Sequence, residues 1–134
     1  MKTLLGILLL CLPALGMAVD TTNDADVPPA DKTAGVDVRD PEVAKQGMAM
    51  LSSTCGGYCH GTEGRGFKGP SLRNRTDLDV DSLHATITFG RKRAGKLMPA
   101  WSGVLSEQEI WTAIAAIVSL RHIDPDSGPK STSH

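Results

Sequence analysis

Two cysteines, a histidine and a distant methionine are the residues of this chain whose spacing predicts chemistry at a metal. Cys55 and Cys59 lie close together, His60 follows directly, and Met98 comes much further along. A Cys pair followed at once by His is typical of covalent haem attachment: each thiol adds to a haem vinyl group, and the imidazole becomes an axial iron ligand. The alternatives are a disulfide or half of a zinc site, and zinc would need a second Cys or His cluster that the sequence lacks. We therefore predict one covalently bound haem c.

The cysteine spacing departs from the usual haem motif, because three residues separate Cys55 from Cys59 where two are usual. Gly56 and Gly57 form part of this spacer. Glycine adopts backbone angles that other residues avoid. We therefore expect a local bulge that absorbs the extra residue without moving either thiol far from its vinyl group.

The second axial ligand is predicted to be Met98. A thioether favours ferrous iron, so His/Met ligation raises the reduction potential above that of two imidazoles. Pro99 holds the residue before it in an extended conformation, which suits a ligand loop. Two alternatives stay open at this point: Met98 is a flexible core residue, or His84 is the second ligand.

The first 18 residues have the pattern of a secretory signal peptide. A short positive segment is followed by an apolar run over residues 4–15, and Gly16-Met17-Ala18 supplies the small residues of a cleavage site. The apolar run is too short for a permanent membrane span. Cleavage after Ala18 would remove Cys11 and leave only the two cysteines of the motif. We expect a periplasmic protein without a membrane anchor after cleavage.

The rest of the chain is long enough for one small domain. Residues 19–39 are acidic and lack apolar periodicity, so they predict a disordered leader, and residues 124–134 predict a disordered tail. Between them, at 40–123, we expect three helices. The first begins at Asp40-Pro41 and leads into the haem motif, the second spans 81–89, and the third follows the capping box at Ser106 and Glu109. Residues 61–79 are rich in turn residues and show no strand pattern. We therefore predict an all-α domain, and we expect a monomer.

These motifs together resemble a class I c-type cytochrome, and the resemblance covers nearly all of residues 40–121. Gly47 stands eight residues before Cys55, where the family has a glycine at the crossing of its first and last helices. Gly69-Pro70-Ser71-Leu72 matches the family's Gly-Pro-x-Leu loop, and Met98-Pro99-Ala100 matches its ligand loop. Leu51 and Ile117 replace the aromatic residues often found at the crossing, so we expect aliphatic packing there.

The resemblance implies a small cytochrome c fold, with three main helices and long loops around one haem. It nominates the Pro70 carbonyl oxygen as the acceptor that orients His60, since a ligating imidazole usually donates its other N–H to a fixed group. Trp101 follows the Met98 loop and is a candidate donor to a haem propionate, as are Arg91 and Arg93. Packing for the tryptophan and solvation for the arginines remain equally good alternatives.

Basic residues gather in two segments of a chain whose formal net charge is only −1. Residues 64–76 and 90–100 each contain four Lys or Arg and no acid. Because ordinary solvated charge is more often mixed in sign, we expect a docking surface for an acidic redox partner. Nucleic acid is a poor alternative, because the chain is exported and aromatic residues do not alternate with these charges.

The leading function is transfer of one electron on the haem, without catalysis of its own. Cys-Gly-Gly-Tyr-Cys-His-Gly, followed by a glycine-rich loop, resembles cytochromes that accept electrons from quinoprotein (PQQ-dependent) alcohol or methanol dehydrogenases, so the expected partners are a periplasmic dehydrogenase and an oxidase or cytochrome acceptor. Two alternatives remain. A haem-based ligand sensor would need Met98 off the iron, and a haem-free thiol protein would need an exposed cysteine of low pKa.

Overall fold

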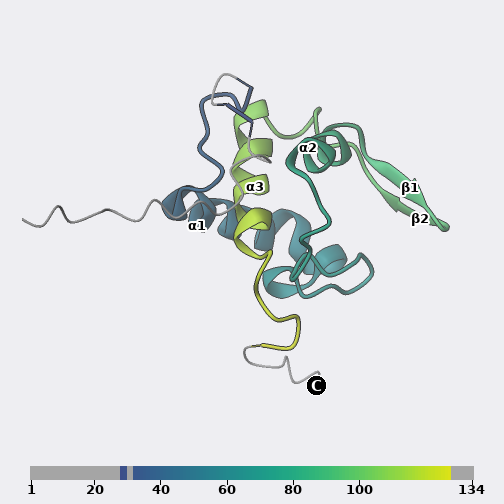
Figure 1. Cartoon of the computed structure of the whole chain (residues 1–134). Coiled ribbons are helices and arrows are strands. Elements are labelled where there is room, and N and C mark those ends of the chain that lie inside the picture. The colour runs from purple at the N-terminus through teal and green to yellow at the C-terminus, as the bar shows by residue number, and fades with distance from the viewer. Residues whose placement is uncertain (1–27, 30–31, 128–134) are drawn as a thin grey trace, which may run out of the picture.

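The computed structural model describes residues 28–29 and 32–127. The predicted signal peptide at 1–18 lies outside these residues, as do most of the predicted leader and the end of the tail. The element order is α1 (Pro41–Met50), η2 (Leu51–His60), η3 (Thr62–Gly64), α2 (Val80–Phe89), β1 (Arg91–Arg93), β2 (Lys96–Met98) and α3 (Glu107–Ser119). The three α-helices and long loops confirm the predicted all-α class (Figure 1).

The helix ends follow the residue signals. The Asp40 carboxylate accepts hydrogen bonds from the backbone N–H groups of Glu42 and Val43, and Pro41 occupies the first turn of α1. At the start of α3, Ser106 and Glu109 form the predicted reciprocal capping box. These caps satisfy backbone donors that the helices themselves leave unpaired.

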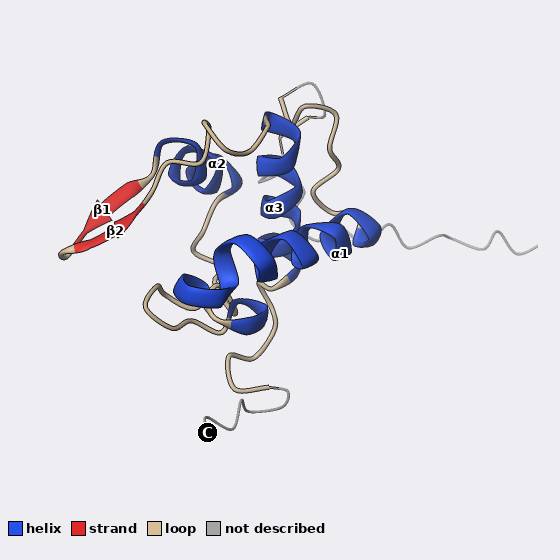
Figure 2. Ribbon diagram, turned by 180° about the vertical axis from the view of Figure 1, so that it is seen from behind, coloured by secondary structure: helices blue, strands red, loops and turns tan. Residues whose placement is uncertain are grey.

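Helices α1 and α3 cross in close contact (Figures 1 and 2). At the crossing, a Cβ on Gly47 would collide with the Thr112 carbonyl oxygen and would lie 3.1 Å from the Ala116 Cβ. Leu51 and Ile117 are both buried, in agreement with the expected aliphatic packing. The missing side chain at position 47 therefore lets the two backbones approach, as the sequence predicted.

The haem motif lies in a helix of a different kind from α1. From Leu51 to His60 the chain forms π-helical turns that continue α1 without a break. A π-turn holds more residues than an α-turn, so the helix itself takes up the extra residue between the cysteines. The expected bulge takes the form of these π-helical turns and does not use glycine-specific angles, because neither Gly56 nor Gly57 is among the residues with positive φ. Gly56 instead fits a narrow space, where a Cβ would lie 3.1 Å from the carbonyl oxygens of Leu51 and Gly61.

The packed domain extends beyond the predicted boundaries at both ends. Val36 and Val38 are buried in the core, and the buried Thr33 hydroxyl donates to the Val36 carbonyl at 2.6 Å. At the other end, the Arg73 guanidinium donates to the carbonyl oxygens of Asp124 and Ser127. Residues within 32–39 and 124–127, outside the expected 40–123 domain, therefore make packed or hydrogen-bonded contacts. Two buried valines are enough to dock a short polar segment that has no helical periodicity.

A small β-hairpin is the element that the sequence did not predict. β1 and β2 pair antiparallel, with Arg91 opposite Met98 and Arg93 opposite Lys96. Ala94 and Gly95 form the two-residue turn, both with positive φ, as such hairpin turns require. The hairpin projects from the body beyond α2 (Figures 1 and 2). Its basic sequence has low strand propensity, so nothing in the sequence signals these two strands.

No helix in the part of the chain that the structure describes combines the length and the apolar character needed to cross a bilayer.

The α1–α3 crossing yields a stability prediction. Gly47→Ala should lower the free energy of unfolding by roughly 1–3 kcal/mol, the usual cost of overpacking a core, because the new methyl group must push α1 away from Thr112. Gly103→Ala is the matched control, since a Cβ there meets nothing within 4 Å. Urea unfolding of both variants tests this, and equal stability would mean that the crossing is not tight.

Candidate haem site

Both cysteines of the motif lie in the same helical element as the histidine. Cys55 and Cys59 are free thiols, each partly buried, and both lie in η2 next to His60. Burial, with a smaller contribution from the neighbouring Cys59, raises the pKa of the Cys55 thiol. A redox-active cysteine needs a lowered pKa to supply a thiolate, so the environment of Cys55 disfavours the haem-free thiol alternative.

His60 is held in a single orientation. Its ring is buried, and Nδ1 lies 2.9 Å from the Pro70 carbonyl oxygen. A carbonyl only accepts hydrogen bonds, so Nδ1 must carry the proton and donate. In the neutral ring, Nε2 then keeps its lone pair for a metal. The contact is the one that the family resemblance predicted, and it is what a haem-ligating imidazole requires.

Backbone hydrogen bonds hold the Pro70 loop against the end of η2. Gly69 N–H donates to the Cys59 carbonyl at 2.7 Å, and Gly66 N–H donates to the His60 carbonyl at 2.6 Å. The loop passes so close to the imidazole that a Cβ on Gly69 would lie 3.2 Å from His60 Cε1 and 3.3 Å from Nδ1. Gly69 therefore matters to this loop because its lack of a side chain leaves room for the His60 ring.

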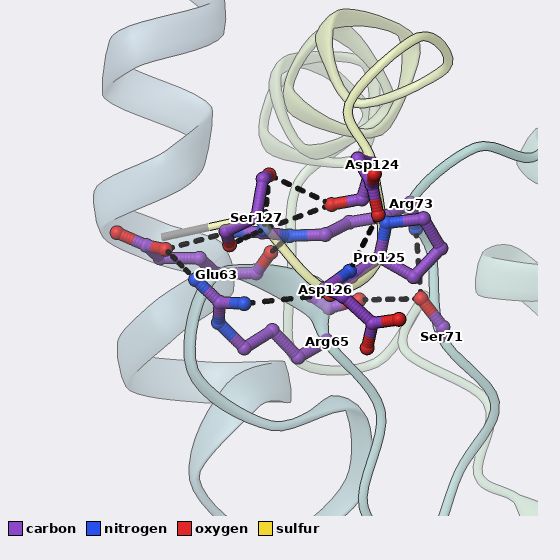
Figure 3. A network of polar contacts seen from close by, with 9 residues as sticks. Glu63, Arg65, Ser71, Arg73, Asp124, Pro125, Asp126 and Ser127 are labelled. Carbon is purple, nitrogen blue, oxygen red and sulfur yellow. Dashed lines mark hydrogen bonds and ion pairs between the residues drawn. The ribbon is translucent and has the colours of Figure 1, made fainter. Parts of the chain in front are cut away.

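A buried arginine fixes the far side of the same loop (Figure 3). The Arg73 side chain is only 4% exposed, and its Nη2 forms an ion pair with Glu63 at 2.7 Å while Nε donates to the Glu63 carbonyl at 2.9 Å. Its Nη1 reaches the Ser127 carbonyl at 2.9 Å. This network ties both ends of the loop to the C-terminal segment. No local pattern in the sequence pairs Glu63 with Arg73, so sequence reasoning missed it.

The structure places Met98 at the end of β2, where it packs partly buried against the hydrophobic core. Cys55 and Trp101 contact the same core cluster. Two backbone hydrogen bonds hold the chain just after Met98 against the end of α2: Trp101 N–H donates to the Ile87 carbonyl at 3.0 Å, and Ser102 N–H donates to the Thr88 carbonyl at 3.4 Å. The segment that carries Met98 is therefore held by its pairing with β1 and by bonds to α2 directly after it.

His84, the rival axial ligand, is engaged elsewhere. Its Nε2 lies 2.6 Å from a Glu107 carboxylate oxygen, and its ring stacks on Trp111 with centroids 4.5 Å apart. The Trp111 indole N–H donates to the same carboxylate oxygen. These contacts link α2 to α3 through His84. Because the His84 ring is already engaged there, Met98 is the better candidate for the second ligand.

The two basic segments differ in the folded chain. In residues 64–76, Arg65 and Arg73 pair with Glu63, and Arg75 pairs with Asp77 at 2.6 Å. Glu63 and Asp77, the acids that neutralise this segment, lie just outside its two ends in the sequence. The prediction of an unpaired basic surface is therefore wrong for the three arginines of this segment. Lys68 lies over the Tyr58 ring and bonds its hydroxyl. Only the second segment, on the hairpin, stays unpaired among the described residues.

The residues present fit a haem. Two free thiols precede an imidazole in the same helical element, and the Nε2 of that imidazole is free to bind iron, as argued above. Several large apolar side chains are mostly exposed and would suit the cover of a large apolar group: Tyr58, Phe67, Phe89 and Val104. No cluster of three or more His, Cys, Asp or Glu exists within residues 28–29 and 32–127, which speaks against zinc there.

Comparison with known proteins defines the class that this fold and site represent. Residues 42–115 match the family model described as "Cytochrome C oxidase, cbb3-type, subunit III". The chain is 41% identical over 63 residues to cytochrome c55X of Stutzerimonas stutzeri, covering 46% of this chain and 53% of that protein. The chain thus spans about half the length of the curated relative that it matches.

Two solved structures are similar. Cytochrome CL from the marine methylotrophic bacterium Methylophaga aminisulfidivorans MPT matches with a TM-score of 0.52 and 26% identity, over 61% of this chain and 55% of that one. The c-type cytochrome NirC matches with a TM-score of 0.46 and 28% identity, over 60% and 93%.

The family match covers more than half of the chain, and the chain therefore belongs to this cytochrome c family. Members of the class I c-type cytochromes carry a covalent haem c that transfers electrons, so the predicted fold and cofactor are confirmed.

Attachment can be tested directly. The mature protein, produced in a host with haem-ligation machinery, should carry one haem that survives denaturation, as seen by mass spectrometry. Cys55→Ala should leave a single thioether and shift the pyridine haemochrome band, while Ser53→Ala, an exposed change on the same helix, should not. A haem-free mass for the wild type would contradict covalent attachment.

The close approach of Gly69 to His60 gives a second test. Gly69→Ala should turn or displace the imidazole, because the new methyl group would press on Cε1 and Nδ1. Since the ligand's orientation tunes the metal, the reduction potential of the holoprotein should shift, whereas Gly103→Ala should leave it unchanged. Equal potentials in both variants would show that His60 is not iron-bound in this geometry.

Proposed function

We propose that this protein is a periplasmic electron carrier whose haem is attached at Cys55 and Cys59 and bound axially by His60 and Met98. The observation that carries the proposal is the 2.9 Å contact between His60 Nδ1 and the Pro70 carbonyl. It fixes the tautomer that exposes Nε2 to a metal, and it does so with a rigid acceptor. A c-type haem supplies reversible one-electron transfer when bound.

Met98 is the second ligand in this proposal. Its segment is tied to the end of α2, it packs on the same core as Cys55, and its rival His84 is bonded to Glu107. His60 and Met98 would together hold the iron and leave no ligand position for a substrate, which favours a carrier over an enzyme or a ligand sensor. Trp101 and Pro70 then act in support, Trp101 through packing on the same core as Met98 and Pro70 through His60.

The proposed donor is a periplasmic dehydrogenase of the PQQ-dependent kind, and the proposed acceptor is an oxidase or another cytochrome. The Cys-Gly-Gly-Tyr-Cys-His-Gly string supports the donor, as does the similarity to cytochrome CL of a methylotroph. The signal-like residues 1–18 support export to the periplasm. Purified dehydrogenase of this class that failed to reduce the protein would contradict the donor, while leaving the carrier function intact.

Axial ligation is the part of the proposal that a variant tests most sharply. Met98→Ala should abolish the weak near-infrared band of a sulfur–iron bond, lower the reduction potential and let the reduced protein bind carbon monoxide. Met48→Ala, which removes another partly buried methionine, should keep the band. If His84→Ala changes the spectrum and Met98→Ala does not, bis-histidine ligation holds. If the wild type itself binds carbon monoxide, the sensor alternative holds.

A further inference from the structure

The β1–β2 hairpin carries four cations that the rest of the described chain leaves unpaired. The four side chains are exposed, and none of them forms an ion pair or a side-chain hydrogen bond with another described residue: Arg91, Lys92, Arg93 and Lys96. This contrasts with residues 64–76, whose arginines are bound to Glu63 and Asp77. Within the described residues, unpaired positive charge is therefore concentrated on the hairpin.

Strand pairing sorts these cations by face. Residues opposite each other in an antiparallel pair share a face, and side chains alternate along each strand. Arg91 pairs with Met98 and Arg93 pairs with Lys96, so three cations and Met98 share one face. Lys92 pairs with Leu97 on the other face. We call the face of Arg91, Arg93 and Lys96 the cationic face.

We propose that the cationic face of the hairpin docks an acidic patch on the protein that exchanges electrons with this one. The proposal rests on the proposed carrier function, because the face ends at the residue assigned there as an iron ligand. A partner bound along it would lie beside the Met98 segment. Charge complementarity of this kind speeds encounter and sets orientation more than it adds affinity.

A protein partner fits the cationic face better than a lipid surface does. Lasting membrane attachment needs apolar insertion together with basic charge. The large exposed apolar residue of the hairpin, Leu97, points with Lys92 to the opposite face, while Met98 on the cationic face is partly buried against the core. The cationic face thus offers charge without an insertable side chain, which suits carboxylates on a folded protein.

The hairpin is built to project these charges. Ala94 adopts φ 48° at the tip, a left-handed conformation that non-glycine residues rarely take. The two-residue turn keeps the strands short and places Arg93 and Lys96 directly beside it. The two cations farthest from the body are therefore the ones that a partner meets first.

The experiment uses reduced holoprotein and two small oxidants of opposite charge, ferricyanide and tris(phenanthroline)cobalt(III). Arg93→Glu/Lys96→Glu should slow oxidation by the anion on the order of tenfold at low ionic strength and speed oxidation by the cation, because local field steers encounter. Lys32→Glu/Lys45→Glu makes the same change of net charge at exposed sites elsewhere and should have a much smaller effect. Both effects should vanish near 1 M salt, where the Debye length is about 3 Å.

Single substitutions test the face itself. Arg93→Glu should weaken binding of a hexaglutamate peptide, followed by NMR titration, more than Lys92→Glu does, although both lie on β1. Equal losses from both variants, or equal oxidation rates in the two double variants, would overturn the proposal. Hairpin-dependent binding to phosphatidylglycerol vesicles without binding to the peptide would overturn it in favour of a membrane. Unchanged haem spectra and potentials in every variant separate failure of docking from failure of the carrier function.

Discussion

The close crossing of α1 and α3 is the constraint on which the site depends. Because Gly47 lacks a side chain, the backbone of α1 can lie against Thr112 and Ala116. That contact fixes the direction in which α1 continues into η2 and so aims Cys55, Cys59 and His60. The haem motif has no separate scaffold. It is the continuation of a helix whose position is set by one missing methyl group.

From there, the site is built in layers. The π-helical turns of η2 accommodate one more residue between the thiols than usual, and the Pro70 loop folds back to bond both Cys59 and His60. Arg73 and Glu63 hold that loop from behind and tie it to the C-terminal segment (Figure 3). Burying the Arg73 charge is costly, and here the half-exposed Glu63 carboxylate and hydrogen bonds to backbone carbonyls offset part of that cost. The Pro70 carbonyl thus orients the imidazole, and the Arg73–Glu63 pair in turn holds the loop that carries Pro70.

Surface charge shows how folding alters a pattern seen in sequence. Both basic segments are free of acids over comparable lengths, and along the chain they look alike. In the folded chain, Glu63 and Asp77 form ion pairs with the arginines of the first segment. The cations of the second segment lie on the hairpin and form no ion pair with a described acid. A docking surface depends on which charges remain unpaired, and that is a property of the fold.

The sequence by itself determined what short-range chemistry controls. The spacing of Cys55, Cys59 and His60 predicted the cofactor, the caps at Asp40 and Ser106 predicted where helices begin, and Gly47 and Pro70 took the contacts that the family resemblance implied. Tertiary structure alone decided how the extra residue is absorbed, that Val36 and Val38 extend the core, that Arg73 is buried, and that a basic stretch pairs as a hairpin. The reason is physical. Caps and ligand motifs act over a few residues, whereas burial and ion pairing depend on neighbours that only the folded chain brings together.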